Sequence, residues 1–238
     1  MKHFIQNKIN LYFHSCSPTA NIAAKVFVGL LLSGFLSGCA SPQRLLLHPQ
    51  DKHFSTPAPA AYRVQLETTR GNILLEIRRE WSPYGADRFY HLVQNGYYNQ
   101  AAIFRIRAGV WAQFGIAASP RVAQLWRSET IPDDPRILSN TRGTVAYAFK
   151  DPNGRTTQVF INLRDNSATH DGEPFVPFAQ VKEGMEVADA LYAGYGENSG
   201  GGIRAGHQDS LFAGGNKYLQ SRYPLLDYIR RARIMPEP

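Results

Sequence analysis

Few side chains of this 238-residue sequence are spaced for covalent or metal chemistry. The seven histidines include no i,i+4 pair, so the helical His pair of many zinc sites is absent. No Gly-x-Ser-x-Gly elbow and no phosphate-binding loop occurs. The run Gly200-Gly201-Gly202 has no lysine after it and favours a flexible loop. The sequence therefore predicts no metal site.

One segment instead combines an arginine, a glutamine and apolar residues, and three later segments follow it in a fixed order. The four segments are Phe104-Arg105-Ile106-x-x-Gly109-Val110-Trp111-x-Gln113-x-Gly115, Gly143-Thr144-Val145-Ala146-Tyr147-Ala148, Pro152-Asn153-x-x-x-x-Gln158-Val159-Phe160-Ile161 and Phe178-x-x-Val181-x-Glu183-Gly184-Met185. In order and spacing they resemble the motifs of the cyclophilins, which are peptidyl-prolyl cis/trans isomerases. The similarity covers roughly residues 62–191. It implies a mostly β fold, a closed eight-stranded antiparallel barrel capped by two helices.

The resemblance also implies a chemistry that needs no nucleophile, metal or cofactor. The barrier to prolyl isomerisation is ~18–20 kcal/mol, because twisting the C–N bond loses amide resonance. Arg105 matches the catalytic arginine, which stabilises the lone pair of the twisted nitrogen. Gln113 matches the glutamine that binds substrate backbone and steadies this arginine, and Phe160 matches the floor of the proline pocket. The alternatives are a solvated strand arginine, an outward-facing glutamine and a core phenylalanine.

The rest of the expected substrate site departs from the family pattern. Val110 stands where the family has phenylalanine, Phe149 stands where it has asparagine, and the family's tryptophan is absent around His170. Two hypotheses therefore remain, an active isomerase and a catalytically weak cyclophilin-like binding module acting as envelope chaperone or scaffold. The further residues predicted to bind substrate are Phe104, Val110, Trp111, Ala148, Phe149, Gln158, His170 and Phe175.

Hydrophobic periodicity predicts the elements that position these residues. Alternating apolar residues over 64–77, around a turn at 69–72, predict a strand hairpin. Ser82-Pro83 and Asn95-Gly96 predict the start and end of a helix. Further strands are expected in 102–107, 110–114, 143–148, 158–163 and 178–181, and a second helix over 185–192. Residues 116–140 read as irregular, 194–215 as a glycine-rich loop, 218–222 as a short helix packed on the barrel and 227–234 as the last strand.

The N-terminal segment is predicted to be an export signal. Residues 1–39 contain three lysines and no acidic residue, and 26–36 form an apolar run too short to span a bilayer. Leu36-Ser37-Gly38-Cys39 resembles the lipobox of bacterial lipoproteins. We therefore expect a signal peptide over 1–38, lipidated Cys39 with an extended, proline-rich tether over 39–61, and a cyclophilin-like domain over 62–238. That domain includes a C-terminal extension, residues 194–238.

Export with removal of the signal peptide limits the kinds of partner that the protein is expected to have. Removal of three lysines lowers the formal net charge from +7 to +4, which does not favour nucleic-acid binding. No aspartate follows Cys39, so the expected location is the periplasmic face of the outer membrane, reached through lipid. The predicted partners are proline-containing polypeptides, with the protein itself a monomer.

Overall fold

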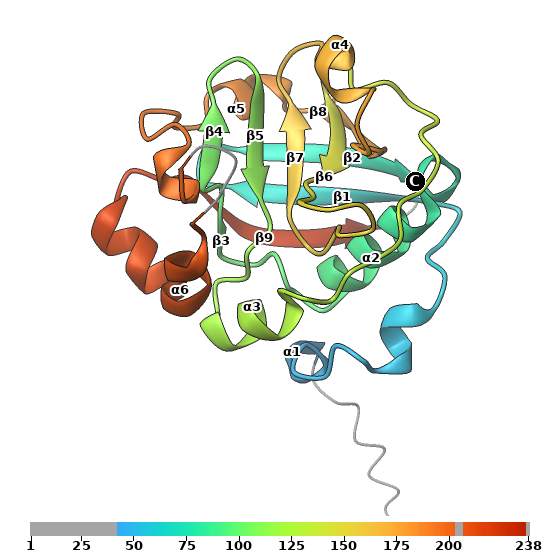
Figure 1. The fold of residues 1–238 in the computed structure, drawn as a ribbon, viewed down its shortest axis with the longest axis horizontal. Helices are drawn as coiled ribbons and strands as arrows, with labels where there is room; N and C mark the ends of the chain where they lie inside the picture. Colours follow the sequence, from blue (N-terminus) through green and yellow to red (C-terminus); the bar gives the residue numbers. More distant parts are fainter. Residues whose placement is uncertain (1–41, 203–206, 237–238) are drawn as a thin grey trace, which may run out of the picture. The chain divides into compact units, whose positions relative to one another are not determined.

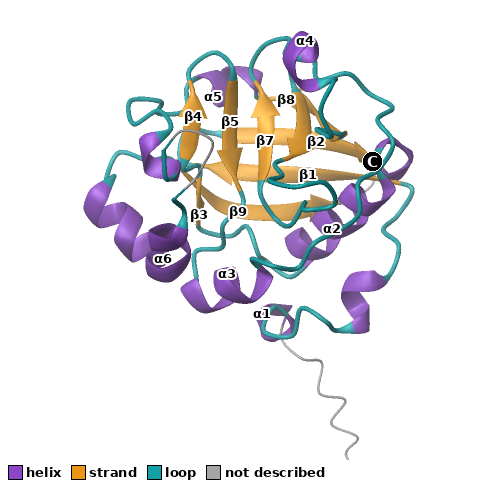
Figure 2. Ribbon diagram, viewed as in Figure 1, coloured by secondary structure: helices purple, strands orange, loops and turns teal. Residues whose placement is uncertain are grey.

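A single curled antiparallel sheet forms the centre of the fold (Figures 1 and 2). The computed structural model describes residues 42–202 and 207–236. The strands are β1 (Ala61–Thr68), β2 (Asn72–Arg78), β3 (Ala101–Ala102), β4 (Arg105–Arg107), β5 (Trp111–Phe114), β6 (Thr144–Tyr147), β7 (Val159–Asn162), β8 (Pro177–Glu183) and β9 (Tyr228–Met235). Their order in the sheet is β3-β9-β1-β2-β8-β6-β7-β5-β4.

The expectation of a closed eight-stranded barrel is wrong in both the number of strands and the closure of the sheet. The sheet has nine strands and forms a curled half-barrel, with β3 and β4 at its two edges. These edges are consecutive in the chain and are separated only by Ile103 and Phe104. Ile103 N–H donates to the Asp227 carbonyl and Phe104 N–H to the Gln113 carbonyl, so each bonds a different strand region. A two-residue β3 leaves no ladder that could join the edges.

The β1–β2 hairpin confirms the alternation read from the sequence. Val64, Leu66, Ile73, Leu75 and Ile77 are all buried, while their neighbours along the strands are exposed or partly exposed. Burial of each such side chain stabilises the fold by roughly 1.5–3 kcal/mol. The hairpin therefore supplies much of the apolar face on which the helices pack.

Helices cover the sheet at several places. They are α1 (Pro42–Leu45), α2 (Pro83–Gln94), α3 (Pro120–Trp126), α4 (Ser167–His170), α5 (Met185–Asp189) and α6 (Asp209–Arg222), with 3₁₀ turns η1 (Lys52–Ser55), η2 (Arg79–Trp81) and η3 (Asn198–Gly200). The predicted helix after Ser82 is confirmed, and its first N–H groups donate to the Asp134 carboxylate, from Tyr84 and Gly85 at 3.2 Å each. The region 116–140, read as irregular, contains α3, which packs against α6.

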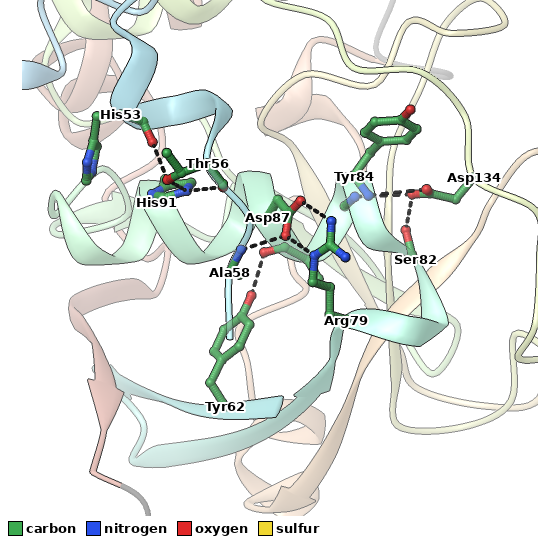
Figure 3. Close-up of polar contacts among 12 residues, drawn as sticks. His53, Thr56, Ala58, Tyr62, Arg79, Ser82, Tyr84, Asp87, His91 and Asp134 are labelled. Carbon is green, nitrogen blue, oxygen red and sulfur yellow. Dashed lines mark hydrogen bonds and ion pairs between the residues drawn. The ribbon is translucent and has the colours of Figure 1, made fainter. Parts of the chain in front are cut away.

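The segment before β1 packs on the domain and is not an extended tether over residues 42–60. Leu46 and Phe54 are buried, and the Leu46 carbonyl accepts a 2.9 Å hydrogen bond from Trp126 Nε1. Figure 3 shows the next contacts, in which Thr56 bonds His91 of α2. Proline content suggested an extended chain, but the buried apolar residues outweigh it. Cys39 lies outside the described residues.

The C-terminal extension contributes to both the helical layer and the sheet. The helix α6 begins nine residues before the predicted position and is kinked at Gly215, whose φ is +53°. The last strand, β9, is confirmed and pairs with both β1 and β3, so it lies inside the sheet. Within the described residues, no helix is both long and apolar enough to cross a membrane.

Candidate active site

The strand register brings three predicted site residues into one row. Arg105 of β4 pairs with Gln113 of β5, Gln113 pairs with Phe160 of β7, and Phe160 pairs with Ala146 of β6. Residues directly opposite one another in antiparallel strands point to the same face. The next residues along these strands, such as Ile106 and Ala112, belong to the hydrophobic core. Alternation alone therefore presents Arg105, Gln113 and Phe160 on the face away from the core.

Three groups surround the Arg105 guanidinium. Nη1 donates to Gln113 Oε1 at 2.9 Å, and Nη2 donates to Glu197 Oε1 at 3.0 Å. The Cζ atom lies 4.5 Å from the centre of the Trp111 ring, which is a cation–π contact. The side chain is 12% exposed, so the guanidinium is shielded but still reaches solvent.

Burial and charge act on Arg105 in opposite directions. Burial lowers the pKa of its guanidinium, and the nearby Glu197 carboxylate raises it. An arginine stays protonated in proteins under either influence. Its Nε atom has no hydrogen-bond partner among the described residues. That Nε atom is itself buried, so the site presents a permanent positive charge through the rest of a partly exposed side chain.

A chain of amides continues from Arg105 along the face. Gln113 Nε2 donates to Gln158 Oε1 at 2.8 Å, and Gln158 Nε2 donates to Gln208 Oε1 at 3.0 Å. Because Gln113 Oε1 accepts from Arg105 while its Nε2 donates to Gln158, both ends of this amide are oriented. Gln113 is only 3% exposed. The predicted steadying role for Gln113 therefore has a direct geometric basis.

An aromatic cluster lies beside this chain. The Phe160 ring centre is 5.4 Å from that of Phe175 and 5.7 Å from that of His170, and Phe149 is 4.6 Å from Phe175. Phe160 itself is 4% exposed, while the other three are partly exposed. Burial lowers the pKa of His170, which favours its neutral ring in this cluster. Four of the predicted substrate-binding residues are thus brought together.

Three other predicted residues lie outside the row and the aromatic cluster. Phe104 is fully buried in the hydrophobic core, one position along the strand from Arg105, so its side chain faces away from the site. Val110 lies in the β4–β5 turn, and its carbonyl accepts hydrogen bonds from Leu163 N–H and Asn166 Nδ2. Ala148 uses its backbone N–H internally, in a 2.9 Å bond to the Gln158 carbonyl.

A buried ion cluster supports the loop that precedes Gln158. Arg155 is completely buried, its Nη2 lies 3.0 Å from Asp134 Oδ2, and its Nε lies 3.1 Å from Asp133 Oδ1. Ser82 at the start of α2 donates to the same Asp134 oxygen at 2.5 Å (Figure 3). This cluster ties the 152–158 loop to α2 and so fixes where β7 begins.

Sequence reasoning missed the residues that approach Arg105 from the C-terminal side. Glu197 and Gly200 contact Arg105, Gln208 bonds Gln158 beside it, and all three come from the segment predicted to be a glycine-rich loop. Glu197 is 92 positions from Arg105 in the chain, and no local spacing signals a contact of that range. A lone acidic residue among glycines was the only available hint.

Comparison with known proteins agrees with this fold. Residues 63–202 match the family described as "Cyclophilin type peptidyl-prolyl cis-trans isomerase/CLD". The chain is 30% identical over 141 residues to a peptidyl-prolyl cis-trans isomerase of Acinetobacter baylyi, covering 58% of this chain and 75% of that protein. It is 32% identical over 154 residues to peptidyl-prolyl cis-trans isomerase cyp18 of Streptomyces antibioticus, covering 61% of this chain and 89% of the relative.

Solved structures show the same fold at lower sequence identity. A cyclophilin type peptidyl-prolyl cis-trans isomerase of Cryptosporidium parvum superposes with a TM-score of 0.53 at 17% identity, covering 75% of this chain and 99% of that one. Cyclophilin AquaCyp293 from Hirschia baltica gives 0.51 at 16% identity, covering 74% and 75%. The class defined here is a mostly β protein with the cyclophilin fold. The chain belongs to the cyclophilin-type peptidyl-prolyl cis-trans isomerase family.

Proposed function

We propose that this cyclophilin isomerises prolyl peptide bonds with Arg105 as its catalytic residue. The observation that carries the proposal is the cross-strand row of Arg105, Gln113 and Phe160. It places a cationic donor two strands away from an aromatic ring, with an oriented amide between them. Cyclophilins act on proline-containing peptides, and the row supplies the groups that such a substrate needs.

The chemistry follows from what changes as the prolyl bond twists. In the planar amide the nitrogen lone pair is delocalised, and in the twisted state it is localised and pyramidal. A guanidinium directed at this nitrogen binds the twisted state more strongly than the planar one, which lowers the barrier. Arg105 meets this requirement because it is charged, oriented by Gln113 and still partly exposed.

The aromatic cluster is the proposed contact for the proline ring. Phe160 forms its floor, while the partly exposed Phe149, His170 and Phe175 surround it. Trp111 adds aromatic surface next to Arg105. In this proposal these rings supply the aromatic surface that the family obtains from two other residues. Those are a phenylalanine at the position of Val110 and a tryptophan near the position of His170. Access to Phe160 requires a shift of at least one neighbouring ring, because Phe160 is 4% exposed.

That same burial favours the second candidate function, a binding module with weak turnover. Gln113 and Phe160 are two of the residues that the substrate should touch, and both are nearly inaccessible. A proline peptide that binds without being isomerised would distinguish this function from catalysis. The test measures both properties on the full chain in detergent, with NMR exchange between the cis and trans forms of an Ala-Pro peptide for the rate and line broadening for binding. If the peptide binds with no rate enhancement, the isomerase hypothesis is rejected in favour of the binding module.

We further propose that the protein assists folding of exported proteins while anchored by lipid on Cys39. The support is the sequence Leu36-Ser37-Gly38-Cys39 after a short apolar run. A diacylglyceryl cysteine at the mature N-terminus, found by mass spectrometry, is the expected result. Loss of membrane fractionation in Cys39→Ser tests the anchor, and a variant that stays with membranes would refute it.

A further inference from the structure

The segment after α5 contacts Arg105 through both a charge and its backbone. Glu197 Oε1 accepts from Arg105 Nη2 at 3.0 Å, and the Glu197 side chain is 25% exposed. At Gly200, an added Cβ would lie 2.6–2.8 Å from Cβ, Cγ and Cδ of Arg105. Real Cβ atoms do not approach other carbons so closely, so Gly200 packs directly on the aliphatic part of the arginine.

The same segment is fastened to the strand that carries Arg105. The Gly196 carbonyl accepts from Ile106 N–H at 3.2 Å, and Ser199 Oγ donates to the Phe104 carbonyl at 2.5 Å. β4 is an edge strand, so these contacts use backbone groups that its own sheet leaves open. The two hydrogen bonds are made by the residues just before and just after Arg105. They hold the segment, and with it the Glu197 carboxylate, beside Arg105.

We propose that Glu197 is a positioning residue for Arg105. An arginine side chain has many rotamers, and a donor that acts in a transition state is most effective when its orientation is set beforehand. Gln113 restrains Nη1, Glu197 restrains Nη2, and Trp111 lies under the plane. The two anchors leave the second hydrogens of both Nη atoms for substrate. This inference rests on the proposed role of Arg105.

The contact differs from an ordinary surface ion pair. The Arg142–Asp189 pair has side chains 47% and 43% exposed, whereas the Arg105–Glu197 pair has 12% and 25%. Exposed pairs are screened by water and contribute little. The Glu197 carboxylate is partly shielded from water, and it accepts from an arginine that Gln113 already orients. A geometric effect on Arg105 is therefore expected, in addition to any effect on stability.

The test compares Glu197→Ala and Glu197→Gln with the exposed control Asp189→Asn, in the full chain. Misplacing a reacting group by ~1 Å can cost up to ~100-fold. We expect Glu197→Ala to lower kcat and kcat/KM about tenfold with little change in KM. Glu197→Gln should recover most of the loss, because its amide oxygen still accepts from Nη2. Wild-type or faster turnover in Glu197→Ala would overturn the inference.

A double variant separates positioning from other roles and from the proposed function itself. If Glu197 acts through Arg105, then Arg105→Ala and Arg105→Ala/Glu197→Ala have the same residual rate by NMR exchange. A further loss in the double variant overturns the inference. A wild-type rate in Arg105→Ala rejects the proposed mechanism, whereas an impaired Arg105→Ala beside a normal Glu197→Ala rejects only the positioning role. Circular dichroism and Tm of every variant confirm folding.

Discussion

Two arginines of this domain, Arg155 and Arg105, show how the same side chain can serve structure or function. Arg155 is fully buried and meets Asp133, Asp134 and the Pro132 carbonyl. Arg105 is 12% exposed and meets one carboxylate and one amide. A guanidinium that is completely buried between two carboxylates cannot be reached by a ligand, whereas one that is partly exposed can. The difference assigns Arg155 to the scaffold and Arg105 to the site.

The largest expected effect is on folding, from Arg155→Ala. Removing one partner of a buried ion cluster leaves the carboxylate of Asp134 buried without its charge partner, which costs about 3–5 kcal/mol. Urea unfolding should show this loss as a lower midpoint. The matched control is Arg142→Ala, because Arg142 pairs with Asp189 at the surface. Equal stability of the two variants would break the assignment of Arg155 to the scaffold.

Phe160→Ala should impair both stability and binding, because this ring is buried yet lies on the site face. Truncation of a buried phenylalanine costs about 3–5 kcal/mol, and the aromatic neighbours lose their shared contact. We expect a lower urea midpoint together with weaker binding of a proline peptide. Phe89→Ala is the control, since Phe89 lies in the core and its loss should affect stability alone. Normal peptide affinity in a folded Phe160→Ala would remove this residue from the site.

Arg105→Ala should have the complementary result, a loss of rate with an intact fold. Loss of one donor to a transition state typically lowers turnover ~10²–10³-fold, or about 2.7–4 kcal/mol. Peptide affinity should change little, because the donor acts on the twisted state. The comparison uses the NMR exchange rate and circular dichroism of the same samples. A rate equal to wild type would show that Arg105, like Arg155, serves only the scaffold.

Part of this contrast is visible in the sequence. The motif around Arg105 and Gln113 predicts the cross-strand row, because strand alternation brings such residues to one face. The start of α2 was predictable from Ser82-Pro83, and Ser119-Pro120 carries the same signal for α3, which the reading of 116–140 as irregular overlooked. These features depend on neighbouring residues, so local pattern is sufficient.

The remaining features depend on contacts far apart in the chain. The approach of Glu197 to Arg105 and the pairing of Arg155 with Asp134 require the folded sheet and loops to be in place. Closure of the sheet likewise depends on the length of β3, which is only two residues. Docking of residues 42–60 depends on the burial of Leu46 and Phe54. None of these has a periodicity or a motif.

The smallest expected effect concerns His91 Nδ1, another buried side-chain nitrogen without a hydrogen-bond partner among the described residues. His91 Nε2 lies 2.7 Å from the Thr56 carbonyl, which can only accept, so the neutral ring carries its proton on Nε2 (Figure 3). Nδ1 is buried with no partner among the described residues, and His91 is 3% exposed. Unlike Arg105 Nε, this atom is remote from the candidate site. Leaving this nitrogen without a hydrogen-bond partner should therefore lower the stability of the fold and not the isomerase rate.

Burial lowers the pKa of His91, and this sets the direction of the effect. The unfolded chain then binds the proton more readily, so stability is complete above about pH 6.5 and decreases as the pH falls below it. One such group contributes a slope of at most about 1.4 kcal/mol per pH unit. His91→Gln keeps a donor for Thr56 without titrating, and should reduce the decrease in Tm between pH 7 and 5. The exposed control His48→Gln should not. An isomerase rate that follows the same transition at temperatures well below Tm would instead link His91 to the site, and the separation between scaffold and site would fail.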